Sequence, residues 1–249
     1  MISLVAVDGI PEVKPGDDLA AMIAAALAAA DIGLKADDVL VITQKVVSKA
    51  EGRVVELSSI SPRPAAEAWA EQWGKDPRQV ELVLQESAEV LRMAQGGLII
   101  SRTRHGFVCA NAGVDLSNVG GGDVATLLPV DSDASATALR ERLGELTGAS
   151  PAVVISDSFG RPWRNGIVNV AIGSAGLEPL LDLRGTPDAQ GRVMHSTVVA
   201  VADELASAAD LAGGKVAQRP VVLISGYEYQ PGHGAASALV MDRELDLFP

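Results

Sequence analysis

The stretch "PAVVISDSFGRPWRNGIVNVAIGSAG", residues 151–176, places two apolar runs on either side of a polar segment. The runs 151–156 and 166–176 contain many β-branched residues, which favours two strands of the protein core. Between them stand charged residues, Trp163 and the two glycines Gly160 and Gly166, so we expect a loop with unusual backbone freedom there. The polar residues of this loop, which stand where the apolar strands end, are therefore candidates for functional residues.

Working outward, strands and helices alternate along the rest of the chain. The patterns predict further strands at 2–7, 38–43, 97–103, 106–114, 125–130 and 219–225. They predict helices at 19–30, 64–73, 76–94, 131–148 and in the second half of 196–214. The stretch 44–55 interrupts this pattern with polar and basic residues. Crossovers combined with a hairpin around 104–106 indicate an α+β or mixed α/β fold, and residues 1–249 are expected to form one catalytic unit.

Composition excludes several classes of protein. The chain has 249 residues and a net charge of -12, so it would repel nucleic acid. Its longest apolar run, 19–30, is too short to cross a bilayer, and its first residues lack the basic region of a signal peptide, so neither a signal peptide nor a membrane partner is expected. The single cysteine, Cys109, cannot form an internal disulfide and is expected to be a small buried residue, which favours the cytoplasm.

Carboxylates follow two of the apolar runs. Asp157 and Ser158 come at the end of one expected strand, and Asp115 follows another, with Ser117 and Asn118 close behind. Such hard oxygen ligands suit Mg²⁺ or Mn²⁺, whose remaining positions are filled by water or phosphate. The alternative is that these aspartates only cap turns.

Positive charge collects near the same places in an otherwise acidic chain, which favours an anionic ligand such as phosphate. The residues are Lys45, Lys49, Arg53, Arg161 and Arg164. There is no Walker A sequence and no convincing GxGxxG, so a nucleotide site would be neither P-loop nor Rossmann. The histidines, His105, His195 and His233, lack the spacing of a zinc site.

Four segments in order resemble the coenzyme F420 gamma-glutamyl ligase family: "ITQKVVSKAEGR", "AGVDLSNVG", "ISDSFGRPWRNGIVNVAIGSAG" and "ELDLFP". The resemblance begins at "DGIPEVKPGDDL" and covers nearly the whole chain, in the stand-alone form without the nitroreductase-like domain of some members. It implies a homodimeric ligase that uses GTP and a divalent metal to join L-glutamate to coenzyme F420-0 and that can then add γ-linked glutamates.

The resemblance also assigns roles to individual residues. Metal is expected at Asp115, Asp157, Ser158 and Glu204. GTP is expected at Ile10, Pro11, Glu12, Val13, Gln44, Lys49, Asn118 and Lys215. Developing charge would be stabilised by Lys49, Arg161 and Arg164, and Trp163 is expected to anchor its loop. The chain departs from the family at "SGYEY", where Arg-Gly is usual, and at Pro249, where a basic residue is usual.

Chemistry and resemblance together favour an acyl phosphate path, in which the carboxylate is first phosphorylated and then attacked by the amine of glutamate. Two other classes use the same residue types. A metal-dependent phosphohydrolase would need no amino-acid acceptor, and a non-catalytic GTP-binding module would turn over nothing.

Overall fold

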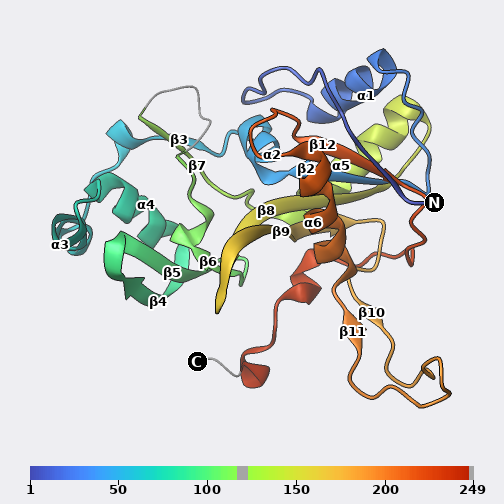
Figure 1. Ribbon diagram of the computed structural model, residues 1–249. Coiled ribbons are helices and arrows are strands. Elements are labelled where there is room, and N and C mark those ends of the chain that lie inside the picture. The colour runs from blue at the N-terminus through green and yellow to red at the C-terminus, as the bar shows by residue number, and fades with distance from the viewer. Residues whose placement is uncertain (117–122, 247–249) are drawn as a thin grey trace.

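The computed structural model describes residues 1–116 and 123–246 (Figure 1). Its helices are α1 (Leu19–Ala29), α2 (Gln44–Ala50), α3 (Pro64–Trp73), α4 (Pro77–Glu86), α5 (Ser132–Thr147) and α6 (Val201–Gly213). Its strands are β1 (Ser3–Ala6), β2 (Val39–Thr43), β3 (Val54–Glu56), β4 (Ser87–Ala94), β5 (Leu98–Thr103), β6 (Val108–Ala110), β7 (Val124–Thr126), β8 (Ala152–Arg161), β9 (Arg164–Ala175), β10 (Leu181–Asp182), β11 (Val198–Val199) and β12 (Val221–Ser225).

A five-stranded mixed sheet forms the centre, in the order β1-β12-β2-β8-β9. Only β2 and β8 run parallel, and every other pair in this sheet is antiparallel. Because successive side chains of a strand point to opposite faces, the apolar runs supply both faces of this sheet. Leu40 and Ile42 face one side, whereas Val39 and Val41 face the other.

Helices cover both faces and make three layers (Figure 1). On one face, α1 and α5 pack through residues such as Ile23 and Leu143. On the other face, α6 packs through Leu205 and its neighbours. Asp18 and Asp131 cap α1 and α5 by accepting backbone N–H groups, and Gly148 ends α5 in the left-handed conformation. The predicted α+β or mixed α/β fold is confirmed.

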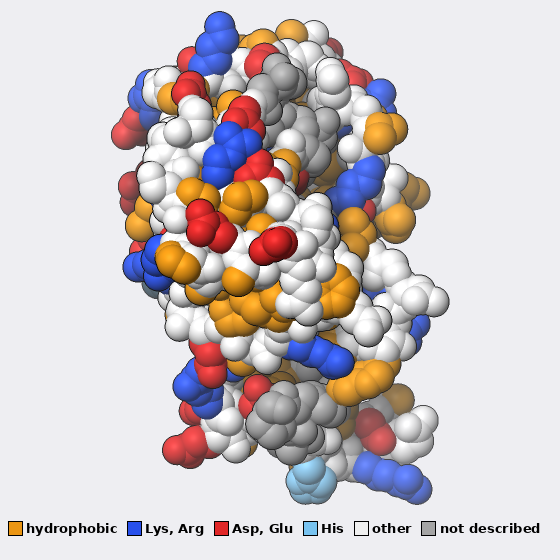
Figure 2. Space-filling view, turned by 90° about the vertical axis from the view of Figure 1, so that its left-hand side faces the viewer, with side chains coloured by type: hydrophobic (Ala, Val, Ile, Leu, Met, Phe, Trp, Pro, Cys, Tyr) orange, Lys and Arg blue, Asp and Glu red, His pale blue; other side chains and the backbone are white. Residues whose placement is uncertain are grey.

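Residues 54–116 and 123–127 form a second, smaller body, called here the small unit. It contains the β3-β7 pair, α3, α4 and the sheet β4-β5-β6, and it has cores of its own. One face of it exposes apolar side chains between acidic and basic ones (Figure 2). Exposed apolar residues on its three-stranded sheet are Val90, Leu91, Met93, Leu98 and Val108.

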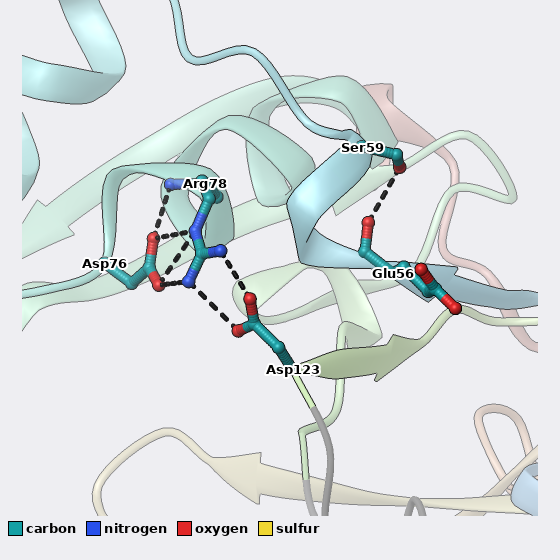
Figure 3. Close-up of polar contacts among 5 residues, drawn as sticks. All are labelled: Glu56, Ser59, Asp76, Arg78 and Asp123. Carbon is teal, nitrogen blue, oxygen red and sulfur yellow. Dashed lines mark hydrogen bonds and ion pairs between the residues drawn. The ribbon is translucent and has the colours of Figure 1, made fainter.

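Arginines tie the small unit together and to the central layers. Arg78 at the start of α4 donates from Nε to Asp76 (3.0 Å) and from a terminal nitrogen to Asp123 beside β7 (3.0 Å), as Figure 3 shows. Arg53 donates to the carbonyl of Leu128 (2.9 Å) in the central core and to Glu86 (2.8 Å) at the end of α4.

Several expected elements differ from the structure. The helix expected at 76–94 ends at Glu86, where the Ser87 hydroxyl donates to the carbonyl of Val83 (2.6 Å), and 87–94 is β4. Pairing with β5 provides partners for that backbone, so tertiary contacts override the helical pattern. The strand expected at 125–130 is only Val124–Thr126.

The stretch 44–55 was expected to break the alternation of strands and helices, but its first part is the helix α2. Val47 of this helix packs into the central core. Among the described residues, no helix combines the length and the apolar composition that crossing a membrane requires.

Candidate functional site

The middle of β8 carries the polar cluster of the central sheet. Asp157 and Ser158 are consecutive, so their side chains leave on opposite faces of the strand. Asp157 lies on the side of α2 and the small unit, and Ser158 lies on the side of α6. The candidate site therefore has two parts that share one strand.

The first part brings together two carboxylates and a lysine. The Lys45 ammonium lies 2.7 Å from an oxygen of Asp115. Burial raises the pKa of Asp157 to about 6, and the negative charge of Asp115 acts in the same direction. The Ser158 N–H and the positive charges of Lys215 and Lys45 act in the opposite direction. Asp115, Asp157 and Lys45 thus form one electrostatic group.

The small unit supplies Asp115 and holds its backbone firmly. Asp115 and Thr126 exchange both backbone hydrogen bonds, at 3.0 and 2.8 Å, and the Thr126 hydroxyl donates to the Asp115 carbonyl (3.2 Å). Thr126 is fully buried at the end of β7. Since Asp157 belongs to the central sheet, this part of the site depends on how the two bodies meet.

The second part is a relay of polar groups between β8, β9 and α6. The Ser158 hydroxyl donates to the side-chain oxygen of Asn169 (2.7 Å), and the Asn169 nitrogen donates to Asp210 (3.3 Å). Lys215 donates to the Ser158 oxygen and to the Asn169 oxygen (3.3 Å for the latter). Asn169 is only 5% exposed, so these bonds replace the water it has lost.

Helix α2 places its basic residues by helical spacing. Lys45 and Lys49 are four residues apart and therefore lie on one side of the helix. The Lys49 ammonium lies 2.6 Å from Glu12, which joins α2 to the expected nucleotide segment 10–13. Gln44 is buried and accepts the Ser48 hydroxyl (2.8 Å).

A loop was expected between the runs 151–156 and 166–176, with "GRPWRNG" (160–166) at its centre, but the structure has only a tight turn at 162–163. β8 and β9 continue through this stretch as a hairpin in which Arg161 pairs with Arg164. The turn places Pro162 before Trp163, whose φ of 56° is unusual for a residue other than glycine. Of the two glycines, Gly166 has a positive φ of 87°, whereas Gly160 does not.

The tip of this hairpin lies beyond the cluster. Arg161 is four residues further along β8 than Asp157, about 13 Å along a strand. It donates to the Asn165 carbonyl (3.1 Å), and Arg164 is exposed. Trp163 is 80% exposed, so burial does not anchor the turn.

Other expected site residues lie elsewhere or are not described. Glu204 is exposed in the first turn of α6, and its backbone N–H bonds to Ala200. Ser117 and Asn118 lie outside the described residues. Val13 is buried in the central core and Ile10 packs against it, while Pro11 is exposed.

The oxygen atoms of this site are donors of the kind that a hard divalent cation prefers, but they are too few to bind a metal without further ligands. Among residues 1–116 and 123–246, no group of three or more His, Cys, Asp or Glu side chains comes together in metal-binding geometry. The two carboxylates lie on one face of β8 and the Ser158 hydroxyl on the other, so each set is enough for Mg²⁺ or Mn²⁺ only when water or phosphate completes the shell. The residues present therefore fit a cation that arrives with a phosphate ligand.

Asn169 and Asp210 are site residues that the sequence patterns did not identify. An Asn within the apolar run "IVNVAI" was the available signal, because a buried amide in a strand needs specific partners. Cys109 is buried, as expected, and burial together with the Asp157 charge raises the pKa of its thiol to about 12. It remains a neutral thiol and is not a nucleophile at neutral pH.

A small cavity adjoins the second part of the site. It is lined by the ends of β2 and α6 and by buried polar groups of β8 and β9. Polar and glycine residues in its wall include Thr43, Ser156, Asn169, Asp210, Gly213 and Gly214. The Ser156 hydroxyl is buried there without a hydrogen-bond partner among the described residues.

Comparison with known proteins adds a consistent result. The family model described as F420-0:Gamma-glutamyl ligase matches residues 9–226. A protein of Methanothermobacter thermautotrophicus named "Coenzyme F420:L-glutamate ligase" is 48% identical over 252 residues, covering 99% of this chain and 98% of that protein. Proteins of the same name from Methanopyrus kandleri and Methanocaldococcus jannaschii are 44% and 42% identical, covering 95% and 85% of this chain and 93% and 84% of theirs.

Proposed function

Because the chain belongs to the F420-0:gamma-glutamyl ligase family, we propose that it joins L-glutamate to coenzyme F420-0 in an amide bond and uses GTP to drive the reaction. The observation that carries this proposal is the two-part cluster on β8, where half-buried oxygen ligands meet Lys45 of α2 and Lys215 of the segment after α6. Such a site suits a ligand that combines phosphate with a divalent cation.

The nucleotide is proposed to lie along α2 and the end of α6. Lys45 and Lys49 present two positive charges from one side of α2. Gly213 and Gly214 precede Lys215 and line the cavity, which allows a ligand to approach the backbone closely. These features favour phosphate contacts at Lys49 and Lys215 without a P-loop.

Mg²⁺ or Mn²⁺ is proposed on both sides of β8: Asp115 and Asp157 would be the protein ligands of one cation, and Ser158, on the opposite face, would be a ligand of a second. When bound, each cation supplies positive charge that neutralises phosphate oxygens. Asp157 is largely shielded from water and lies near the second carboxylate, Asp115. A cation at this place would neutralise the Asp157 charge, which is otherwise costly to hold there.

The proposed reaction has two balanced steps. A carboxylate oxygen of F420-0 attacks the γ-phosphorus, and the bond from phosphorus to the β–γ bridging oxygen breaks to release GDP. The glutamate amine then attacks the acyl carbon, phosphate leaves with its electron pair, and the amine loses a proton. Lys45 and Lys49 are positioned to stabilise negative charge on the transferred group.

The test measures GDP release with one component omitted at a time. We expect release to require F420-0, L-glutamate and metal, and to match amide formation one for one. A metal-dependent phosphohydrolase would release GDP at the full rate without F420-0 and glutamate. That result, with no glutamyl product, would contradict the ligase assignment.

A homodimer is proposed as the working form. The exposed apolar side chains of the β4-β5-β6 sheet support a second copy as their partner, since such a surface is costly in water. Sedimentation equilibrium tests this: a dimer is expected for the wild-type chain, and a monomer at micromolar concentration would contradict it.

A further inference from the structure

The Ser158 and Asn169 side-chain oxygens form a two-oxygen position for a cation. Both oxygens face the same group, the Lys215 ammonium. Ser158 uses its hydrogen toward Asn169, so its lone pairs are directed toward the cation. A hydroxyl and an amide oxygen held this way are the hard donors that Mg²⁺ and Mn²⁺ use.

Asp210 fixes the orientation of the Asn169 amide. Its carboxylate can only accept a hydrogen bond, so the Asn169 nitrogen must face it. The Asn169 oxygen then has to point toward Ser158 and Lys215. The Asn169 backbone is also held, because the Ser207 hydroxyl of α6 donates to its carbonyl (2.7 Å). The position is therefore built before any ligand arrives.

Lys215 is well placed to enter and leave this position. It lies in the segment between α6 and β12 and is an exposed residue, whereas Asn169 is buried. Its charge also acts on Asp157, so it neutralises both parts of the site.

We propose that Lys215 is a tethered cation that fills the Ser158–Asn169 position in the metal-free protein and is displaced when a divalent cation binds there. Once displaced, its ammonium can turn to the phosphate that accompanies the cation. The inference deepens the proposed function and rests on its divalent-cation site. It assigns Asn169 as a further ligand and Asp210 as a positioning residue.

The test is a Mn²⁺ titration without nucleotide, in which free Mn²⁺ is followed by electron paramagnetic resonance. The variants are Lys215→Met, which keeps the length of the side chain but removes its charge, and Lys35→Met, a matched control on an exposed loop. We expect Lys215→Met to bind Mn²⁺ about fivefold more tightly than wild type, because a competitor that fills the position four-fifths of the time imposes that factor. Lys35→Met should differ little from wild type.

Three results would overturn the inference. If Lys215→Met and Lys35→Met bind Mn²⁺ equally, or if Lys215→Met binds it more weakly, Lys215 does not compete for the position, while the metal site itself stands. If neither wild type nor Lys215→Met binds Mn²⁺, either alone or in a repeat of the titration with GDP present, the metal proposal fails together with this inference.

Chemical labelling of lysines provides a second readout. Mg²⁺ should increase acetylation of Lys215, measured by peptide mass spectrometry, and should leave Lys35 unchanged. In the Lys215→Met background, Asn169→Ala should weaken Mn²⁺ binding; unchanged affinity would exclude Asn169 as a ligand.

Discussion

The Asp157 carboxylate has an environment that lowers the stability of the folded protein when the group is ionised and no cation is bound. Its carboxylate is buried in β8, and Asp115 adds a like charge. Both effects favour the protonated form, so the pKa in the folded protein, about 6, is above the usual value of 3.8. Ionising this group therefore destabilises the metal-free fold, and a bound cation would offset that cost.

The sign of the pH dependence follows from this shift. Below pH 4 the group is protonated in both states and makes no difference. Between pH 4 and 6 the unfolded chain loses the proton first, so stability falls as pH rises, and the loss is complete about one pH unit above 6. Asp157→Asn removes the charge and should stabilise the metal-free protein at pH 8 by about 3 kcal/mol.

Denaturant unfolding in EDTA at pH 4 and pH 8 checks this prediction. Wild type and Asp157→Asn should be similar at pH 4 and separate at pH 8. A variant less stable than wild type at pH 8 would show that the carboxylate is stabilised by its lysine neighbours more than burial disfavours it.

At the scale of elements, side chains of α6 form hydrogen bonds with the backbone of the edge strand β9. Asp203 accepts the backbone N–H of Ala171 (2.8 Å), next to a register shift between β8 and β9. Ser207 donates to the carbonyl of Asn169 (2.7 Å). An edge strand otherwise presents unpaired backbone groups, so α6 both covers the sheet and aligns the strand that carries Asn169.

Asp203→Ala should therefore destabilise the protein by about 1–3 kcal/mol, because the Ala171 N–H loses its acceptor. Asp203→Asn is the matched control, since it retains an oxygen acceptor and removes the partly buried charge. Thermal unfolding should place Asp203→Asn close to wild type and Asp203→Ala well below it. Equal losses in the two variants would mean that the charge, rather than the acceptor, matters.

Predictions from sequence succeeded where a local signal sufficed. The cap residues Asp18 and Asp131 and the terminal Gly148 define α1 and α5, and β-branched runs define β2 and β12. They failed where a distant partner decides, as at 87–94, which pairs with β5.

The same division applies to the site. The position of Asp157 and Ser158 after an apolar run was visible in the sequence, and the structure brings Asp157 close to Asp115 and Lys45. That Ser158 works from the opposite face, with Asn169 and Asp210, depends on strand register and on where α6 ends. No local pattern encodes either.

At the scale of the whole molecule, the site requires the small unit and the central layers to keep their relative position. The C-terminal segment helps to fix it. Asp133 of α5 accepts the backbone N–H groups of Ala236 (2.7 Å) and Ser237 (3.2 Å). Further along, Arg243 forms an ion pair with Glu89 of β4. One segment thus links α5, which packs on the sheet that holds Asp157, to the small unit, which holds Asp115.

Mass spectrometry of F420-0 incubated with the protein, GTP, Mn²⁺ and L-glutamate tests the central claim most directly. Wild type should add a glutamyl unit to F420-0. Asp157→Asn, although folded and more stable without metal, should form this product at least about 100-fold more slowly, because removing a metal ligand costs more than the 10–100-fold loss typical of its outer partners. No glutamyl product with wild type, or undiminished product with Asp157→Asn, would contradict the account.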